Sequence, residues 1–409
     1  MAYFSLESTT MKAWLGTPGL ACALGHGVDE IRARLYAADT TGMRPLAGWM
    51  DDRTPTLGAY VGARAEWPHH IATHHRTRNN QLLLTAAIQI EPALREAIFR
   101  HGAHRIGVVL GTSTSSVDDN VDALRGLSSE GKLPACYDYR RQVLSSPSAF
   151  LSDWLGIDGP CYTISTACTS SARALLTARA LLAMDVCDAV ICGGADTLCR
   201  LTINGFAALG ALSGQLCTPF SRNRNGINIG EAAVLFLMEK SPIQTPCVAL
   251  LGGAGSSDAW HMSAPEPNGK GAIQAMQAAL ENTGLTPADI GWVNLHGTAT
   301  QHNDAMESLA MQAVFNEYQV PCASTKALTG HALGAAGALE AALTWISLSP
   351  HNPDGILPPH VWDGQPDPIL PPLNFSTTSH RYPSGKPRIA MSNSFAFGGN
   401  NTSLILGTA

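Results

Sequence analysis

Apolar residues along the chain occur in two arrangements that alternate from one end to the other. Short runs of mainly apolar residues lie at 105–110, 188–195 and 232–238, with glycine or charged residues at their ends. This pattern is typical of strands buried on both faces. Longer stretches rich in alanine and leucine follow these runs with helical spacing. This alternation predicts an α/β architecture with a mostly parallel sheet in each half.

The first half of the pattern predicts a strand and loop at 11–25, a helix at 28–35 and one long helix at 79–99. From about residue 247 the order of elements begins again, although no residues repeat. Further apolar strands are expected at 292–298, 389–395 and 403–407, and a helix at 332–343. We therefore expect two similar α/β halves, residues 1–246 and 247–409.

Composition narrows the class of protein. Hydrophobic residues make up 45% of the 409 positions, charged residues make up 14%, and the net charge is −6 without any run of lysine or arginine. This balance argues against a nucleic-acid or membrane partner. No apolar run reaches the roughly 18 residues of a membrane span. The ten cysteines form no CxxC pair and no zinc-type spacing, so we expect free thiols and a cytoplasmic location.

Two polar segments of the first half have less specific interpretations. The histidines His69, His70, His74 and His75 could bind metal, but no acidic or cysteine companion accompanies them at regular spacing. A solvated loop or a partner surface is the favoured interpretation. The loop 111–116 consists of small hydroxyl residues at a strand end, where open α/β sheets place ligands, and it lacks the glycines of a phosphate-binding loop.

A single cysteine occupies the stretch around which the chain is organised. Short β-prone residues from Tyr162 run into Cys168, and small residues then lead into a helical segment that reaches about Met184. A helix N-terminus at this position would favour a thiolate and could bind an oxyanion beside the sulfur. Taken alone, Cys168 would more often be one of many buried structural cysteines.

Three stretches of the second half change that assessment. His296 ends an apolar strand, and Lys326 and His331 lie in a short loop before a helix. A glycine pair, Gly398 and Gly399, follows another strand directly. A thiolate at a helix start, two histidines at strand ends and a flexible glycine loop are together the parts of nucleophilic acyl transfer.

The segments 165–170, 296–300, 326–337 and 393–401 resemble those of the elongating β-ketoacyl-acyl carrier protein synthases, the Cys-His-His condensing enzymes of the thiolase fold. The resemblance covers nearly the whole chain in order. It implies a layered α-β-α-β-α sandwich and a decarboxylative condensation that proceeds by a ping-pong mechanism. It also implies a dimer, an acyl carrier protein as partner, and no metal or cofactor beyond the phosphopantetheine that the carrier holds.

The resemblance also assigns roles. Cys168 corresponds to the acyl-accepting nucleophile, His296 and His331 to the pair that polarises the malonyl thioester, and Lys326 to the lysine that orders the site. The oxyanion hole and gate are assigned to Cys168, Phe395, Phe397, Gly398 and Gly399. Substrate binding is assigned to Thr114, Phe206, Thr298 and Thr300, and structural support to Glu231, Asp304, Glu307 and Glu340.

Departures from the family pattern point toward a specialised pathway. Ala396 stands where the gating loop usually has glycine and is expected to stiffen the gate. The sequence Gln301-His302-Asn303 replaces the usual small or proline residues, and Ser221 and Asn225 stand where acidic residues are common. Thr114 falls where the family sets the depth of its acyl tunnel. A small polar residue there fits a conjugated polyene, extended with a catalytically silent paralogue that sets chain length.

Three alternatives are weighed against this interpretation. A thiolase would need a second catalytic cysteine in the C-terminal glycine motif, where Ser394, Phe395 and Phe397 stand. An initiating synthase would have an asparagine in place of His331. A chain-length-determining subunit without catalysis usually lacks the nucleophile, which this chain retains. Whether the dimer contains one gene product or two stays open.

Overall fold

The computed structural model describes residues 11–50, 56–62, 65–242 and 246–408. Its main sheet has the strand order β13-β12-β14-β15-β11-β1-β10-β8-β6-β7, with β2 beside β10 and β3 beside β2. The strands are β1 (Ala13–Leu15), β2 (Gly19–Cys22), β3 (Gly25–His26), β6 (Ile106–Gly111), β7 (Cys161–Ile164), β8 (Ala189–Asp196), β10 (Ala232–Glu239), β11 (Val248–Ser257), β12 (Trp292–Asn294), β13 (Cys322–Ala323), β14 (Ile389–Ala396) and β15 (Asn400–Gly407). A small separate sheet contains β4 (Arg44–Pro45), β5 (Leu57–Ala59) and β9 (Ile229–Gly230).

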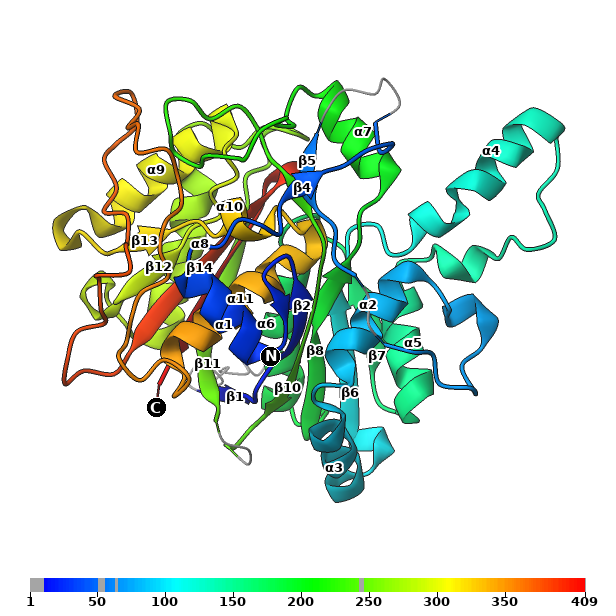
Figure 1. Cartoon of the computed structure of the whole chain (residues 1–409). Helices are drawn as coiled ribbons and strands as arrows, with labels where there is room; N and C mark the ends of the chain where they lie inside the picture. Colours follow the sequence, from blue (N-terminus) through cyan, green and yellow to red (C-terminus); the bar gives the residue numbers. More distant parts are fainter. Residues whose placement is uncertain (1–10, 51–55, 63–64, 243–245, 409) are drawn as a thin grey trace, which may run out of the picture.

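The helices form layers on and between the two halves of this sheet (Figure 1). The α-helices are α1 (Val28–Tyr36), α2 (Arg78–Ala87), α3 (Glu91–His101), α4 (Val121–Glu130), α5 (Ser146–Leu155), α6 (Ser170–Ala183), α7 (Arg200–Ala208), α8 (Lys270–Thr283), α9 (Gln301–Phe315), α10 (Lys326–Thr329) and α11 (Ala336–Leu348). Helices α6 and α11 contact each other and strands of both halves, so they form the central layer. Helices α2 and α5 cover the outer face of the first half, and α8 covers that of the second.

Strand β10 shows why the sequence runs are continuously apolar. Val234 and Phe236 point into the central core, and Leu235 and Leu237 point into the outer core under α2. Successive side chains of a strand face opposite sides, so a strand buried on both sides has no polar face. In the central layer, a Cβ on Gly337 of α11 would lie 2.7 Å from Ala172 of α6, so glycine allows the two helices to pack closely.

Several sequence predictions need correction. The expected mostly parallel sheets are mixed. Among the described strands of the main sheet, parallel pairs involve only β6, β7, β8, β12, β13 and β14, whereas β10 runs antiparallel to β8 and β15 runs antiparallel to both β14 and β11. Strand β14 returns through a turn at 397–399 directly into β15, and such a short connection forces an antiparallel pair.

Two predicted helices also differ. The long helix expected at 79–99 is divided into α2 and α3, because the chain breaks after Ala87 and restarts with Pro92 in the first turn of α3. The helix expected at 332–343 begins only at Ala336, after a 3₁₀ turn (Leu333–Ala335) in which Leu333 has φ of 49°. Among the described helices, none is both long and apolar enough to cross a membrane.

Candidate active site

Cys168 lies in a tight turn between β7 and α6. The preceding Ala167 has φ of 53°, and α6 starts at Ser170 with Thr169 as its N-cap residue. The Ser170 hydroxyl accepts a hydrogen bond from the Thr166 N–H at 2.9 Å and donates to the Ala167 carbonyl. On the neighbouring strand, a Cβ on Gly111 would lie 2.2 Å from the Ser171 nitrogen, so glycine lets the start of α6 approach β6. This turn therefore fixes the sulfur two residues before the helix.

The sulfur of Cys168 is buried and protonated at rest. Burial raises the pKa of the Cys168 thiol to about 12, which outweighs the lowering by the charge of Lys326. The thiolate expected at the helix start is therefore not the resting form. The Nε2 atom of His331 lies 2.9 Å from the sulfur, within reach of the thiol proton.

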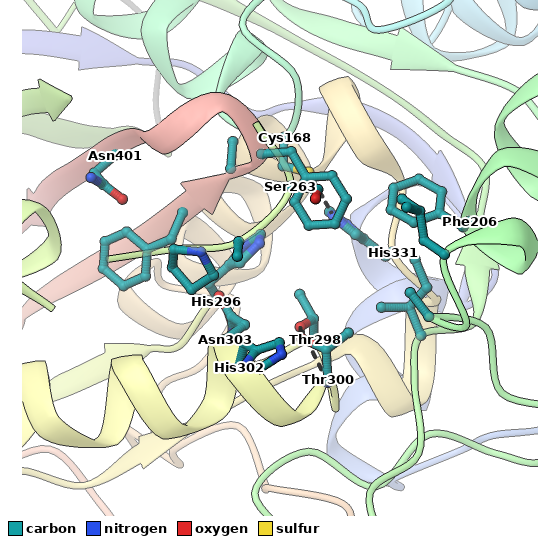
Figure 2. Close-up of a pocket in the computed structure, with 18 residues that line it drawn as sticks. Cys168, Phe206, Ser263, His296, Thr298, Thr300, His302, Asn303, His331 and Asn401 are labelled. Atoms are coloured by element: carbon teal, nitrogen blue, oxygen red, sulfur yellow. Dashed lines mark hydrogen bonds between the residues drawn. The ribbon is translucent and has the colours of Figure 1, made fainter. Parts of the chain in front are cut away.

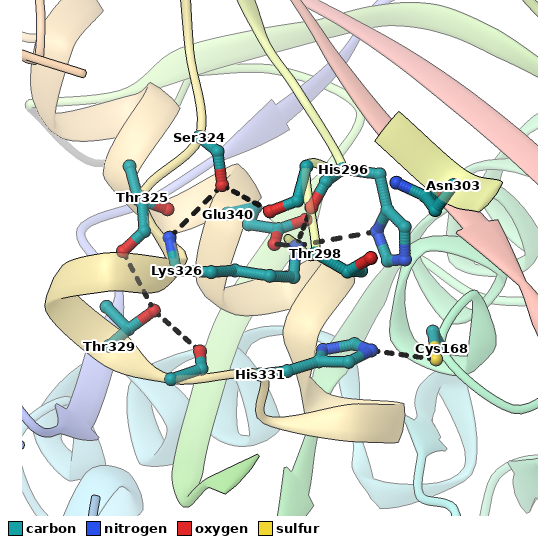
Figure 3. Close-up of polar contacts among 12 residues, drawn as sticks. Cys168, His296, Thr298, Asn303, Ser324, Thr325, Lys326, Thr329, His331 and Glu340 are labelled. Carbon is teal, nitrogen blue, oxygen red and sulfur yellow. Dashed lines mark hydrogen bonds and ion pairs between the residues drawn. The ribbon is translucent and has the colours of Figure 1, made fainter. Parts of the chain in front are cut away.

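The two histidines face each other across this sulfur (Figure 3). The rings of His296 and His331 meet edge to face with centroids 5.2 Å apart, and nitrogen atoms of both lie within 4.8 Å of the Cys168 sulfur and of each other. Burial lowers the pKa of His296 and of His331 well below the usual value, and the nearby Lys326 lowers both further. Both imidazoles are therefore neutral at physiological pH.

Lys326 determines which nitrogen of His296 carries the proton. Its Nζ atom donates to the His296 carbonyl and to Glu340 Oε1, and it lies 3.4 Å from His296 Nδ1. An ammonium group has three donors and no acceptor, so Nδ1 must accept and the proton of His296 resides on Nε2. In the described part of the chain, Nδ1 of His331 has no hydrogen-bond partner, so neither tautomer of His331 is fixed in this way.

Two buried carboxylates hold the loop that carries His296. Glu307 accepts hydrogen bonds from the backbone N–H groups of His296 and Gly297, both at 2.7 Å. Asp304 accepts from the N–H groups of Thr298 at 3.1 Å and Phe220 at 2.7 Å. Burial raises the pKa of Glu307 to about 8 and that of Asp304 to about 6. Helix α9 thus anchors the loop at the end of β12.

Cys168 and the two histidines open into a pocket that Figure 2 shows. Predicted residues that line it are Cys168, Phe206, His296, Thr298, Thr300, His331, Phe395 and Phe397. The hydroxyls of Thr298 and Thr300 lie 2.9 Å apart. Sequence reasoning did not assign the further lining residues His302, Asn303 and Asn401, although 301–303 was noted as a departure from the family pattern.

A second cavity adjoins the first pocket at Cys168. It is lined by Thr114, Ser165, Thr202 and Leu333, among others, and shares Cys168, Phe206 and Phe397 with the first pocket. The rings of Phe206 and Phe397 pack with centroids 5.4 Å apart. This aromatic pair thus lies where the two cavities adjoin, next to the sulfur.

The loop of Thr114 depends on a carboxylate that the sequence analysis overlooked. Asp196, at the end of β8, accepts hydrogen bonds from the Thr112 hydroxyl at 2.7 Å and from the Ser113 N–H at 2.8 Å. The Thr114 N–H lies 3.2 Å from the same carboxylate. An acidic residue directly after the apolar run 188–195 was the available signal.

The glycine loop after β14 is tied to the segment 258–262. The Gly398 N–H donates to the Met262 carbonyl and the Asp258 N–H donates to the Gly399 carbonyl, both at 2.8 Å. Gly399 has φ of 73°, and a Cβ there would meet Asp258 at 2.8 Å. Ala396 is in an extended conformation, with φ of −117°, that any residue adopts. Alanine is therefore not strained in this conformation, and the expected stiffening of the gate stays a prediction.

Glu231 lies away from the pocket. Its carboxylate accepts from Arg78 Nη2, the Val61 N–H and the Leu198 N–H, each at 2.7 Å. These contacts connect β10 to the loops before α2 and α7.

The chain matches two family models in tandem, the β-ketoacyl synthase N-terminal domain over residues 52–242 and the β-ketoacyl synthase C-terminal domain over residues 248–361. It is 32% identical over 412 residues to the 3-oxoacyl-[acyl-carrier-protein] synthase 2 of Coxiella burnetii, which covers 95% of this chain and 96% of the relative. It is 29% identical to the chloroplastic 3-oxoacyl-[acyl-carrier-protein] synthase I of Hordeum vulgare, with 95% and 87% covered.

Solved structures with similar folds include the complex of a ketosynthase (ApeO) with its chain length factor (ApeC) from Xenorhabdus doucetiae. The match has a TM-score of 0.87 and 45% identity, and it covers 99% of this chain and 100% of the other. A β-ketoacyl synthase from Burkholderia phymatum matches with a TM-score of 0.85 and 29% identity over 98% of this chain and 100% of the other. The layered α/β sandwich is therefore the thiolase-like ketoacyl synthase fold. With matches over nearly its full length, the chain belongs to the β-ketoacyl synthase family of condensing enzymes and is a 3-oxoacyl-acyl carrier protein synthase, an acyltransferase.

Proposed function

We propose that Cys168 accepts an acyl chain from a carrier protein and that His296 and His331 then drive the decarboxylation of malonyl carrier on the same site. The observation that carries this proposal is the position of His331 Nε2, 2.9 Å from the Cys168 sulfur, with His296 facing both. A nucleophile, a base and a second donor around one pocket are what acyl transfer followed by carbanion formation requires.

In the first half-reaction the sulfur attacks the thioester carbonyl as His331 Nε2 takes the thiol proton. The backbone N–H groups of Cys168 and Phe397 stabilise the oxyanion. The carbon–sulfur bond to the carrier then breaks, and the leaving thiolate recovers the proton from His331. A neutral imidazole is required for this step, and the lowered pKa of His331 supplies it.

In the second half-reaction the malonyl thioester carbonyl accepts hydrogen bonds from Nε2–H of both histidines. The carbon–carbon bond to the carboxylate breaks, CO₂ leaves, and the electron pair forms an enolate held by these donors. The enolate carbon attacks the acyl group on Cys168, and the carbon–sulfur bond to Cys168 breaks. The thiolate then takes up one proton from solvent, because the original thiol proton has left with the first carrier. Lys326 holds the proton of His296 on Nε2, so His296 donates a hydrogen bond in this step. Among the described residues, Nδ1 of His331 has no hydrogen-bond partner, so the ring proton can reside on either nitrogen. Nε2 of His331 therefore accepts a proton in the first half-reaction and donates a hydrogen bond in the second.

The acyl chain extends, in this proposal, from Cys168 past Phe206 and Phe397 into the cavity at Thr114. The placement of Phe206 and Phe397 in both cavities supports a gate that the chain opens as it grows. Thr298 and Thr300, in the first pocket, would contact the pantetheine arm. The small hydroxyl of Thr114 fits a chain with conjugated double bonds, which supports aryl polyene or polyketide synthesis.

We also infer a dimer with a paralogue of chain-length-factor type. Strand β7 forms an open edge of the sheet, with exposed Cys161 and Tyr162. Helix α4 projects from the body and exposes Leu124 and Leu127, with no buried side chain of its own (Figure 1). An unpaired edge and an apolar projecting helix invite a second subunit. The matched Xenorhabdus doucetiae structure is itself a complex of this kind.

Intact mass after exposure to acyl-carrier thioester tests the nucleophile. We expect one added acyl mass on the wild type and none on Cys168→Ala. Absence of an adduct with every acyl donor, in protein that is folded, would favour a non-catalytic partner subunit.

Product profiling tests the pathway. The chain is incubated with malonyl carrier and the reductive enzymes of a polyene pathway, with and without the paralogue. Product length should depend on the paralogue, and Thr114→Phe should shorten the products. Equal length with and without the paralogue would refute the heterodimer.

A further inference from the structure

A second cluster of metal-type ligands lies outside the active site. His74 and His75 come from a 3₁₀ turn (Thr73–His75), and Asp153 comes from α5; their ligand atoms all lie within 4.8 Å of one another. None of the three lines either cavity at Cys168. In the sequence, no acidic residue accompanies these histidines at regular spacing. In the fold, Asp153 lies beside His75, although it is 78 residues further along the chain.

His75 is the central member of the cluster. Its side chain is buried, and its Nε2 atom lies 2.7 Å from Asp153 Oδ2. In the described part of the chain its Nδ1 atom has no hydrogen-bond partner. Since Nε2 is the atom that faces Asp153, Nε2 is the nitrogen that would bind an ion there, and Nδ1 is not a ligand in this arrangement.

The other two members leave room for an ion. Asp153 is 65% exposed, so its carboxylate is reachable from solvent. The ring of His74 lies beside that of His75, with centroids 4.1 Å apart. Arg140, whose charge acts on His74, is paired with Asp138 at 2.7 Å. This pairing compensates a charge that would oppose a bound cation.

We propose that His74, His75 and Asp153 form a binding site for a divalent transition-metal ion of the zinc type. Two imidazoles and one carboxylate suit Zn²⁺, Co²⁺ or Ni²⁺ better than Mg²⁺ or Ca²⁺, which prefer oxygen ligands. Three protein ligands leave one tetrahedral position for water. Ligand atoms about 2 Å from a tetrahedral ion are about 3.3 Å apart, so the contact between His75 and Asp153 opens by a few tenths of an ångström on binding.

The site connects two parts of the first half. The 3₁₀ turn precedes α2, and α5 precedes β7, whose far end carries the nucleophile turn. Ser148 of α5 is hydrogen bonded to Thr163 of β7 at 2.8 Å. A bound ion therefore cross-links the segment before α2 to the helix that supports the edge strand β7.

Titration with Co²⁺ in the visible range tests this proposal. The background is Cys168→Ala, because Cys168, His296 and His331 form another cluster that could take metal. We expect one equivalent of Co²⁺ with tetrahedral absorption and without the charge-transfer band of a thiolate ligand. His74→Ala and Asp153→Asn should each weaken binding at least about tenfold. The double variant His69→Ala/His70→Ala, with both exposed histidines outside the cluster removed, should bind as the background does.

The unfolding midpoint of each variant, measured once with chelator and once with Zn²⁺, distinguishes a loss of metal binding from a loss of fold stability. With chelator, Asp153→Asn should unfold near the background midpoint, because Asp153 is largely exposed. Zn²⁺ should raise the midpoint of the background and of the His69/His70 control, and should raise that of Asp153→Asn less at the same Zn²⁺ concentration. Undiminished Co²⁺ binding by Asp153→Asn, loss of binding in the control, or no binding by the background would each overturn the proposal.

Discussion

The two halves of the molecule share one strand order but place different chemistry at equivalent strand ends. After β7 in the first half comes Cys168 and then α6; after β13 in the second half come Lys326 and His331 and then α11. The loop after β6 contains Thr114, and the loop after β12 contains His296. In the proposed mechanism, the first half thus supplies the sulfur that bonds to the substrate, and the second half supplies the imidazoles that accept or donate hydrogen bonds.

Buried carboxylates hold the strand-end loops in both halves, with one difference. Asp196 in the first half and Asp304 and Glu307 in the second accept backbone N–H groups. The difference is that the site in the second half also contains the buried cation Lys326, which is paired with Glu340. Neutral donors, namely backbone N–H groups and the Thr112 hydroxyl, therefore hold the loop in the first half, whereas in the second half the charged Lys326 also sets the tautomer of His296.

The largest expected effect separates the two histidines by reaction step. His296→Ala should lower condensation at least about a hundredfold, because an N–H donor to the enolate is lost. Acylation of Cys168 should persist, since His331 remains beside the sulfur. Intact mass measures the acyl-enzyme and product formation measures condensation. If folded His296→Ala cannot be acylated, the assignment of acylation to His331 without His296 is wrong.

The next effect tests the buried cation. Lys326→Met leaves the Glu340 carboxylate buried without its partner, and we expect the free energy of unfolding to fall by about 3–5 kcal/mol. Lys326→Met/Glu340→Leu should recover most of this loss, because no charge is then left unpaired. Urea unfolding measures both variants, and an equal loss in the double variant would count against the pair as the cause.

A third prediction concerns pH. Burial raises the pKa of Glu307 to about 8 and of Glu231 to about 7, both above the ordinary value of 4.5. The folded state therefore keeps protons that the unfolded chain has released, and stability present at low pH is lost as pH rises through these pKa values. From pH 6 to 8 the free energy of unfolding should fall by about 1–2 kcal/mol for each group.

Glu307→Gln is the matched control for this trend. The amide cannot ionise, so the decline in stability between pH 6 and 8 should be shallower in this variant. A decline as steep as that of the wild type would show that other groups cause it.

The smallest effect concerns the gate. Ala396→Gly should lower the free energy of unfolding by about 0.5–1 kcal/mol, because glycine gains more freedom in the unfolded chain. The extended conformation of Ala396 predicts an acylation rate within about twofold of the wild type. A severalfold faster acylation would instead mean that alanine restrains the opening of the loop.

Cys168, His296 and His331 could be singled out from the sequence because Cys168 and His296 each follow a strand-like run and because the family resemblance includes all three. The structure brings the three side chains together in one pocket, and their roles stay predictions. The protonated resting state of Cys168 could not be predicted, because it depends on burial by residues from both halves. Asp196 and Asp153 were missed for a related reason, since their partners lie 83 and 78 residues away in sequence. The mixed sheet was missed because strand direction depends on connections that the periodicity of side chains does not record.

Strand β1 has a consequence for biosynthesis. It pairs with β10 on one side and β11 on the other, and the Leu15 carbonyl accepts a hydrogen bond from Trp345 Nε1 at 3.1 Å, 330 residues further on. During translation this strand leaves the ribosome long before either neighbour and stays unpaired until both are made. Separately expressed fragments 1–246 and 247–409 should for that reason aggregate, and should regain acyl transfer only when refolded together.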